Sequence, residues 1–313
     1  MPFYTAYMFV KGTLLVLLVT MSCLIVTLSQ LLVFPLYWIS PKWNYMFQSY
    51  SLGRQIRVMQ FVFEELNSGK VTYSGDKVVP GESALLISNH QSGSDFYMIG
   101  ALSRHVGMEP YNRYFLKDSI KYLPIFGWSL YLIGMLFIKR NWLSDHKKID
   151  KVFHTFLHNR LPVWLITYPE GTRFTQKKKQ ESDEFCKSRN LEPFKNVMYP
   201  RVKGTVSSIK KLRHSHVRHL YDITMAYSSK RPNGFRKNPN PFEIHYHEQL
   251  SPNYRFHIHV DKFLLEDLPT DDQELADWIV ERFRVKDKFL ETLKAKSWVD
   301  NLDPKYKVRD CPN

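Results

Sequence analysis

The chain has 313 residues, and 44 Lys and Arg against 30 Asp and Glu give it a formal net charge of +14. Hydrophobic residues make up 44% and aromatic residues 15%, which excludes a disordered or low-complexity protein, and three cysteines are too few for a disulfide framework. The positive surplus predicts an anionic partner, whether nucleic acid, a lipid surface or a phosphorylated substrate.

The N-terminal part of the chain contains a long apolar segment. No charge occurs from Gly12 to Pro41, and Leu14–Ile39 is almost entirely aliphatic and aromatic. As a helix it would extend roughly 39 Å, enough to cross a hydrocarbon core of about 30 Å. A secretory signal would have a shorter apolar core and a small-residue cleavage site. Ser29-Gln30 and Pro35 also permit a break, so the sequence predicts either one membrane crossing or a re-entrant helix pair in the interface.

Aromatic and basic residues follow this segment. The aromatic cluster, typical of a membrane interface, consists of Tyr37, Trp38, Trp43, Tyr45 and Phe47. The basic residues on the same side are Lys42, Arg54 and Arg57, against Lys11 alone before the segment. The positive-inside rule therefore predicts membrane attachment with the rest of the chain in the cytosol.

Beyond residue 60, short apolar runs alternate with helical patterns. Buried strands are predicted at residues 84–87, 135–138, 163–166 and 222–227, and half-buried strands at 242–246 and 256–260. Helical spacing covers Trp142–Arg160 and Thr270–Leu293, the second opened by a capping box of Thr270 and Gln273. Residues 176–190 and 228–241 have the composition of surface loops. The pattern predicts an α/β domain with a largely buried sheet, divided into an anchor (1–60), a core (61–227) and a C-terminal extension (228–313).

A candidate acid–base pair lies directly after the first buried strand. His90 precedes Asp95 by five residues, at the strand-to-helix position where open α/β sheets place their ligand sites. The carboxylate could fix the imidazole through one ring nitrogen and leave the other as a general base. The arrangement is a Ser-His-Asp triad without its serine, so the nucleophile should come from the substrate. Taken alone the pattern is weak, because a loop histidine beside a helix-capping aspartate is more often structural.

Further turns with glycine and basic residues accompany this pair. They are Lys117, Gly134–Arg140, Tyr168–Arg173 and Tyr199–Gly204. Arginine offers a planar fork for phosphate, and glycine permits close approach of the backbone. Four such groups in this order along the chain favour a functional site over a set of unrelated turns.

In these segments the chain resembles the glycerolipid acyltransferases, and in particular the eukaryotic 1-acylglycerol-3-phosphate and lysophospholipid acyltransferases. The first family block, N-H-x-x-x-x-D, is matched by Asn89, His90 and Asp95. The second, G-x-x-F-I-x-R, is matched by Gly134, Phe137, Ile138 and Arg140. The third, E-G-T-R, is Glu170–Arg173, and the fourth, a proline near an apolar strand, resembles Pro200.

The resemblance implies a mixed β-sheet flanked by helices and a set of site residues. His90 would be the base, Asp95 its orienting partner, and Lys117 and Arg173 the phosphate ligands. The residues that would shape the rest of the substrate site are Asn89, Arg140, Glu170, Gly171, Thr172 and Pro200. Backbone amides near the His90 turn or Gly171 are candidates for an oxyanion hole.

The implied reaction moves an acyl group from acyl-CoA, a co-substrate, to the sn-2 hydroxyl of 1-acylglycerol-3-phosphate, with no cofactor, metal or acyl-enzyme. The product would be phosphatidic acid for phospholipid biosynthesis, made at the cytosolic side of the endoplasmic reticulum membrane. Another acceptor is the close alternative: lysophosphatidylethanolamine, lysophosphatidylinositol or lysocardiolipin. A non-catalytic lipid-binding membrane protein is a further alternative, disfavoured by the intact His90/Asp95 pair.

Three other patterns have simpler explanations. Two H-x-H pairs, formed by His245, His247, His257 and His259, could hold a metal if their strands pair, but the polar surface face of a two-stranded edge is the commoner cause. The lysine clusters 177–179 and 210–219 could bind nucleic acid, yet a membrane anchor in the same chain favours anionic lipid or CoA phosphates. Leu123–Ile138 is apolar but short for a crossing, so it is either core or a membrane-facing wall for the acyl chain.

Overall fold

The structure is a computed structural model that describes residues 2–139, 142–230, 234–247 and 249–312. The strands are β1 (Val71–Gly75), β2 (Ala84–Ser88), β3 (Asn112–Lys117), β4 (Leu136–Ile138), β5 (Trp164–Thr167), β6 (His219–Ser229) and β7 (Tyr254–Leu264). The helices are α1 (Pro2–Val33), α2 (Leu36–Ile39), α3 (Pro41–Gln60), α4 (Asp95–His105), α5 (Phe126–Leu132), α6 (Trp142–His158), α7 (Gln176–Ser188), α8 (Val202–Leu212), α9 (Glu243–Tyr246) and α10 (Asp272–Ala295).

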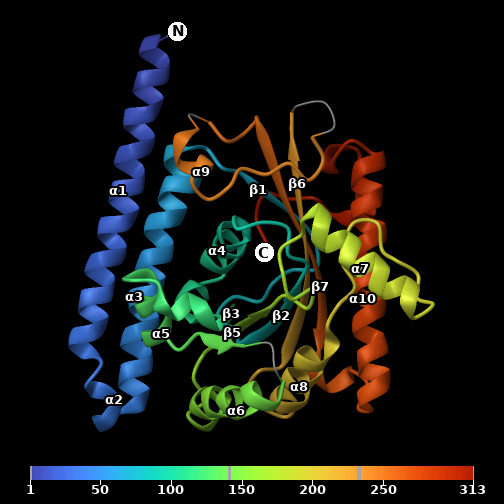
Figure 1. Cartoon of the computed structure of the whole chain (residues 1–313), viewed down its shortest axis with the longest axis horizontal. Helices are drawn as coiled ribbons and strands as arrows, with labels where there is room; N and C mark the ends of the chain where they lie inside the picture. Colours follow the sequence, from blue (N-terminus) through green and yellow to red (C-terminus); the bar gives the residue numbers. More distant parts are fainter. Residues whose placement is uncertain (1, 140–141, 231–233, 248, 313) are drawn as a thin grey trace.

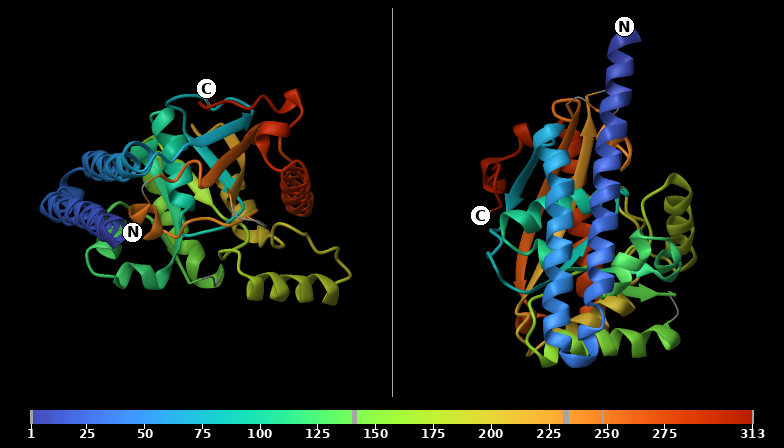
Figure 2. Two further views of the ribbon diagram at one scale, coloured as in Figure 1. Left: turned by 90° about the horizontal axis from the view of Figure 1, so that it is seen from above. Right: turned by 90° about the vertical axis from the view of Figure 1, so that its left-hand side faces the viewer.

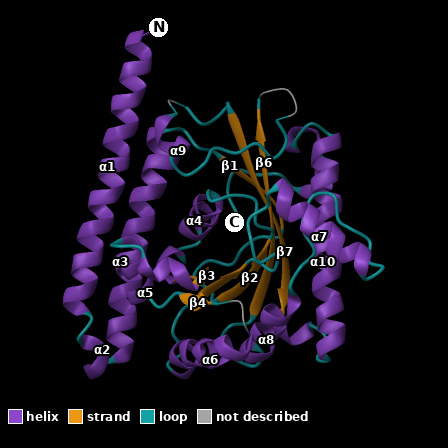
Figure 3. Ribbon diagram, in the orientation of Figure 1, coloured by secondary structure: helices purple, strands orange, loops and turns teal. Residues whose placement is uncertain are grey.

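The strands form one mixed sheet in the order β1-β7-β6-β2-β5-β3-β4 (Figure 3). Only the β6–β7 pair is antiparallel among these neighbours, so the carboxyl ends of β6, β2, β5, β3 and β4 share one edge. This confirms the predicted mixed α/β fold. The predicted strands at 84–87, 135–138, 163–166, 222–227 and 256–260 are also present, each within a few residues.

Both faces of the sheet are buried. Successive residues of β2 point to opposite faces, and each set packs in a different core. Leu85 and Ile87 pack in a core that includes α6, α8 and α10, whereas Ala84 and Leu86 pack in a second core with α4. Figure 1 shows α4 and α10 on opposite sides of the sheet, with α3 and α1 outside α4. This burial explains the continuous apolar runs of the central strands.

The N-terminal segment forms a helical hairpin along one side of the domain (Figure 2). The chain reverses around Pro35, as the sequence allowed, while Ser29 and Gln30 remain inside α1. Polar contacts join α1 to the domain along most of its length. Lys11 Nζ donates to Asn67 Oδ1 (2.8 Å) and Ser129 to Gln30 Oε1 (2.8 Å), while Ser22 donates to Gln55 Oε1 of α3, the other helix of the hairpin (3.0 Å).

The other side of α1 exposes apolar side chains at helical spacing. They include Tyr7, Val10, Leu14, Leu17, Met21, Ile25, Leu28 and Leu32. The helix is long and apolar enough to cross a membrane. Only 11% of its most apolar window is buried within the protein, so it is not a core helix of the domain. Trp38 and Trp43 are exposed as predicted for interfacial residues. Tyr45 is not: it is buried and donates to Pro162 O (2.6 Å).

Residues 242–246 were predicted as a strand and are instead the short helix α9. Asn240 Oδ1 accepts hydrogen bonds from the N–H groups of Phe242 and Glu243 (both 2.9 Å), which starts a helical turn. In a half-buried strand, neighbouring residues alternate between buried and exposed positions. Ile244 and His245 are instead both buried.

Two further local predictions were wrong. Residues 176–190 are not a loop but mostly helix α7, capped by Thr175 Oγ1, which accepts from Lys178 N–H (3.2 Å). The ion pair Lys179–Asp183 (2.5 Å) helps to hold this polar helix. The predicted helix at 270–293 is α10, but its cap is Asp271, which accepts from Gln273 and Glu274 N–H groups, rather than a capping box with Thr270.

The segment Leu123–Ile138 is partly buried core and partly exposed, and its role as a membrane-facing wall for the acyl chain stays a prediction. Ile133, Met135 and Phe137 are buried in a small core with Leu52. The exposed apolar side chains are Leu123, Phe126, Trp128 and Tyr131. Thr27 of α1 donates to Ile125 O (3.3 Å), so this exposed group lies beside α1.

Candidate active site

His90 and Asp95 meet at the carboxyl edge of the sheet, between β2 and α4. His90 Nδ1 lies 2.7 Å from Asp95 Oδ2. The side chain of Asp95 is 2% exposed and that of His90 is 22% exposed. With Nδ1–H donated to the carboxylate, Nε2 is the ring nitrogen that can accept a proton. The geometry is that of a base held by a buried carboxylate.

The Asp95 carboxylate accepts three hydrogen bonds in addition to the one from His90. Gln91 N–H donates to Oδ2 (2.9 Å), Ser92 N–H to Oδ1 (3.1 Å) and the Tyr227 hydroxyl to Oδ1 (2.6 Å). Burial, reinforced by the nearby Asp95 charge, raises the pKa of Tyr227 well above its ordinary value, so the phenol keeps its proton and remains a donor. Four donors replace the water that burial removes and fix the carboxylate in one orientation.

The plane of the His90 ring is fixed by an aromatic neighbour. Tyr168 stacks on it with ring centroids 4.2 Å apart and planes 17° apart, and Tyr114 lies nearly parallel to Tyr168 at a centroid distance of 6.5 Å. Neither Tyr168 nor Tyr227 was among the predicted site residues. The only feature of the sequence that could have indicated them is their position, because each lies at the carboxyl end of a predicted strand.

Glu170 ties the histidine loop to the neighbouring segments. Its Oε2 accepts from His90 N–H (2.6 Å) and its Oε1 from Met198 N–H (2.9 Å). Two backbone bonds complete the junction: Phe174 N–H donates to His90 O (2.8 Å), and Arg201 N–H to Pro169 O (2.7 Å). Gly171 has φ of +70°, which favours glycine at this turn. Burial raises the pKa of Glu170 to about 8, although its two backbone donors oppose the rise.

The raised pKa of Glu170 predicts a pH dependence of stability. Because the folded-state pKa of about 8 exceeds the ordinary 4.5, the folded chain binds this proton more tightly than the unfolded chain. The stabilisation is complete below pH 4.5 and is lost as the pH rises through 8. Glu170→Gln should therefore flatten the fall in the free energy of unfolding across this range, measured by denaturant titration in detergent. The exposed control Glu266→Gln should keep the wild-type slope, and equal slopes in both variants would contradict the assignment.

The other predicted site residues lie along the same edge, with different surroundings. Asn89 is buried, and its side chain pairs with the backbone N–H and C=O of Met225 (2.8 and 2.9 Å), which joins the loop to β6. Arg173 is exposed and approaches Gly93, where an added Cβ would lie 3.0 Å from its Nη1. Lys117 is exposed at the carboxyl end of β3. Thr172 is half-buried and Pro200 buried, while Arg140 lies outside the described residues.

Four of the backbone amides at the His90 turn and Gly171 are already engaged, and the position of the oxyanion hole stays a prediction. The N–H groups of His90, Gln91 and Ser92 donate to the carboxylates of Glu170 and Asp95. The Gly171 N–H donates to Tyr168 O (2.9 Å). These four amides hold the loop rather than face a substrate oxygen.

The four-histidine cluster does not form. His245 and His247 lie in and after α9, whereas His257 and His259 lie on β7, with 0% and 9% exposure instead of the predicted surface position. Ser74 bonds both β7 imidazoles at 2.8 Å. Burial lowers the pKa of His257 to about 3, so this imidazole is neutral at physiological pH. Among the described residues, no group of three or more His, Cys, Asp or Glu has the arrangement of a metal site.

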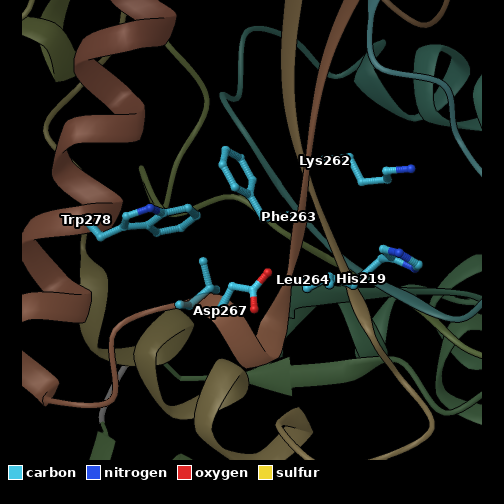
Figure 4. A pocket seen from close by; sticks show the side chains of 7 residues that line it. His219, Lys262, Phe263, Leu264, Asp267 and Trp278 are labelled. Atoms are coloured by element: carbon cyan, nitrogen blue, oxygen red, sulfur yellow. The ribbon is translucent and has the colours of Figure 1, made fainter.

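A cavity of about 280 Å³ lies at the opposite end of β6 from this site (Figure 4). His219, Lys262 and Trp278 are among its lining residues, and Phe263 meets Trp278 edge to face at 5.1 Å. Because His219 begins β6 and Tyr227 stands near its end, this cavity is separate from the His90 site.

Comparisons with known proteins match most of the chain. Residues 70–228 match the family model described as Acyltransferase, and residues 251–309 the one described as Acyltransferase C-terminus. The chain is 31% identical to a probable 1-acyl-sn-glycerol-3-phosphate acyltransferase 5 of Arabidopsis thaliana, over 77% of this chain and 62% of the relative. It is 28% identical to lysocardiolipin acyltransferase 1 of Gallus gallus, over 82% and 66%. It is also 28% identical to 1-acyl-sn-glycerol-3-phosphate acyltransferase epsilon of Mus musculus, over 74% and 63%.

The matched region thus spans about three fifths of the length of these curated relatives. The crystal structure of the 1-acyl-sn-glycerophosphate (LPA) acyltransferase PlsC from Thermotoga maritima aligns with 90% of this chain and 99% of that one. The TM-score is 0.46 and the identity 14%.

Proposed function

The chain belongs to the acyltransferase family, and from this premise we propose that it transfers a fatty acyl group from acyl-CoA to the sn-2 hydroxyl of 1-acylglycerol-3-phosphate. The observation that carries the proposal is the 2.7 Å contact between His90 Nδ1 and the buried Asp95 carboxylate. A base oriented in this way activates a hydroxyl group, and a lysophospholipid supplies one.

In the proposed reaction, His90 Nε2 takes the hydroxyl proton while the acceptor oxygen attacks the thioester carbon. Asp95 stabilises the imidazolium through Nδ1. The tetrahedral intermediate then collapses, the C–S bond breaks, and the imidazolium returns the proton to the CoA sulfur. The products are an ester and free CoA thiol. An acyl-enzyme is unnecessary because both substrates meet at the site and the acceptor is the nucleophile.

Lys117 and Arg173 are proposed to bind the acceptor phosphate. β3 is two strands from β2, a separation of about 10 Å at usual strand spacing, which supports a shared headgroup site for Lys117 and His90. Lys117→Gln and Arg173→Gln should each raise the KM for lysophosphatidic acid about tenfold with a smaller change in kcat. Steady-state kinetics check this, with Arg189→Gln and Lys296→Gln as exposed controls. An unchanged KM would remove the residue from the phosphate site.

A second candidate acceptor is another lysophospholipid, as the similarity to lysocardiolipin acyltransferases of Gallus gallus and Danio rerio suggests. CoA-thiol release with a panel of lysophospholipids separates the two proposals. The first predicts the highest kcat/KM with lysophosphatidic acid. A higher kcat/KM with lysocardiolipin, lysophosphatidylethanolamine or lysophosphatidylinositol would favour the second.

The N-terminal hairpin is proposed to lie in one leaflet rather than to cross the bilayer. A helix whose polar contacts to the domain extend from Lys11 to Gln30 cannot cross alone, because the domain beside it would enter the hydrocarbon region. Its exposed apolar side and the exposed residues of α5 would face the lipid. The proposed location is the cytosolic side of the endoplasmic reticulum membrane.

A further inference from the structure

A surface cavity lies between the turn of the N-terminal hairpin and the end of α6. Its volume is about 500 Å³. The hairpin contributes Tyr37, Ser40 and Lys42, and α6 with the residue after it contributes His154, His158 and Asn159. Figure 1 places α2 and α6 at the same end of the molecule, away from the N-terminus. The cavity thus joins segments separated by more than one hundred residues.

The side chains around the cavity favour an anion. The two imidazoles occupy successive turns of α6 and stack with ring centroids 5.2 Å apart, and Lys42 brings an ammonium group from the hairpin. None of the described residues that line the cavity is acidic. Imidazole N–H groups and an ammonium are donors suited to phosphate oxygens.

The position of the cavity indicates which anion. Trp38 and Ile39, at the hairpin turn, are 72% and 82% exposed, and Leu31 and Leu32 at the end of α1 are exposed apolar residues as well. Exposed tryptophan beside an apolar surface is typical of the level of lipid headgroups in a membrane. A phosphate group at this level belongs to a membrane phospholipid.

We propose that the cavity formed by Lys42, His154 and His158 binds the phosphate headgroup of an anionic membrane phospholipid, which anchors the hairpin turn. The site is distinct from the acyl-acceptor site at His90. The inference rests on the membrane attachment proposed above but not on acyl transfer, so it can fail or succeed independently of the enzymatic assignment.

Partition of the full chain onto vesicles tests the proposal. At mildly acidic pH, the variant Lys42→Gln/His154→Gln/His158→Gln should bind phosphatidylcholine vesicles containing phosphatidic acid at least about tenfold more weakly than the wild type, because each basic group near an anionic surface contributes up to a factor of about five. Binding to pure phosphatidylcholine vesicles should be unchanged. The three residues lie at the surface, and circular dichroism verifies folding.

A matched variant, Lys294→Gln/Lys296→Gln/His105→Gln, removes the same number of basic groups from other exposed positions and should bind nearly as the wild type does. Equal losses in both variants, or none in the first, would overturn the proposal. Inorganic phosphate separates lipid from free anion: if it alone shifts the imidazole NMR signals of His154 and His158 as strongly as the vesicles do, the headgroup assignment is wrong.

Discussion

Replacing His90 with alanine is expected to lower kcat by about 10²- to 10⁴-fold, the usual contribution of a positioned general base. The variant loses the only proposed acceptor for the hydroxyl proton, whereas Asp95 and the proposed phosphate ligands remain. The KM for the lysophospholipid should therefore change little. Formation of labelled diacyl product measures the rate, and thermal melting shows whether loss of the Tyr168 stack has affected folding.

His214→Ala is a suitable control, because this histidine is exposed and lies outside the site. It should keep wild-type kcat and KM. If His90→Ala keeps most of the wild-type kcat while folded, His90 is not the base.

The second large effect is expected for Asp95→Asn. The amide presents an NH₂ group to partners that are all donors: His90 Nδ1–H, two backbone N–H groups and the Tyr227 hydroxyl. It also removes the charge that stabilises the imidazolium. We expect kcat to fall by about 10²-fold or more and the free energy of unfolding to fall by about 1–3 kcal/mol.

Tyr227→Phe provides the comparison for this variant. It deletes one donor to Asp95 but keeps the carboxylate and its contact with His90. Its kcat should fall less than about tenfold. Comparable losses of kcat in the two variants would mean that the hydrogen-bond network, and not the charge of Asp95, supports the reaction.

The core and the His90–Asp95 pair could be predicted because their determinants are local. Central strands buried on both faces appear as short apolar runs, as in β2 and β5. His90 and Asp95 are five residues apart around one strand-to-helix turn, so their contact needs no distant segment.

The features that could not be predicted depend on distant parts of the chain. Tyr227 is 132 residues from Asp95 in the sequence, and it reaches this carboxylate only because β6 pairs with β2. His257 and His259 are buried because the rings of Phe289, Trp298 and Tyr306 pack against them, and Ser74 of β1 bonds one ring nitrogen of each. The hairpin likewise depends on contacts such as that of Gln30 with Ser129, which periodicity does not encode.

Acceptor-dependent release of CoA thiol is the most direct test of the central claim, direct attack by the lysophospholipid hydroxyl with His90 as base. The purified chain should release thiol from acyl-CoA only when a lysophospholipid is present. Thiol and diacyl product should form in equal amounts, and His90→Ala should release almost none. Absence of thiol release with every lysophospholipid, or a burst of thiol equal to the enzyme concentration without an acceptor, would contradict the claim.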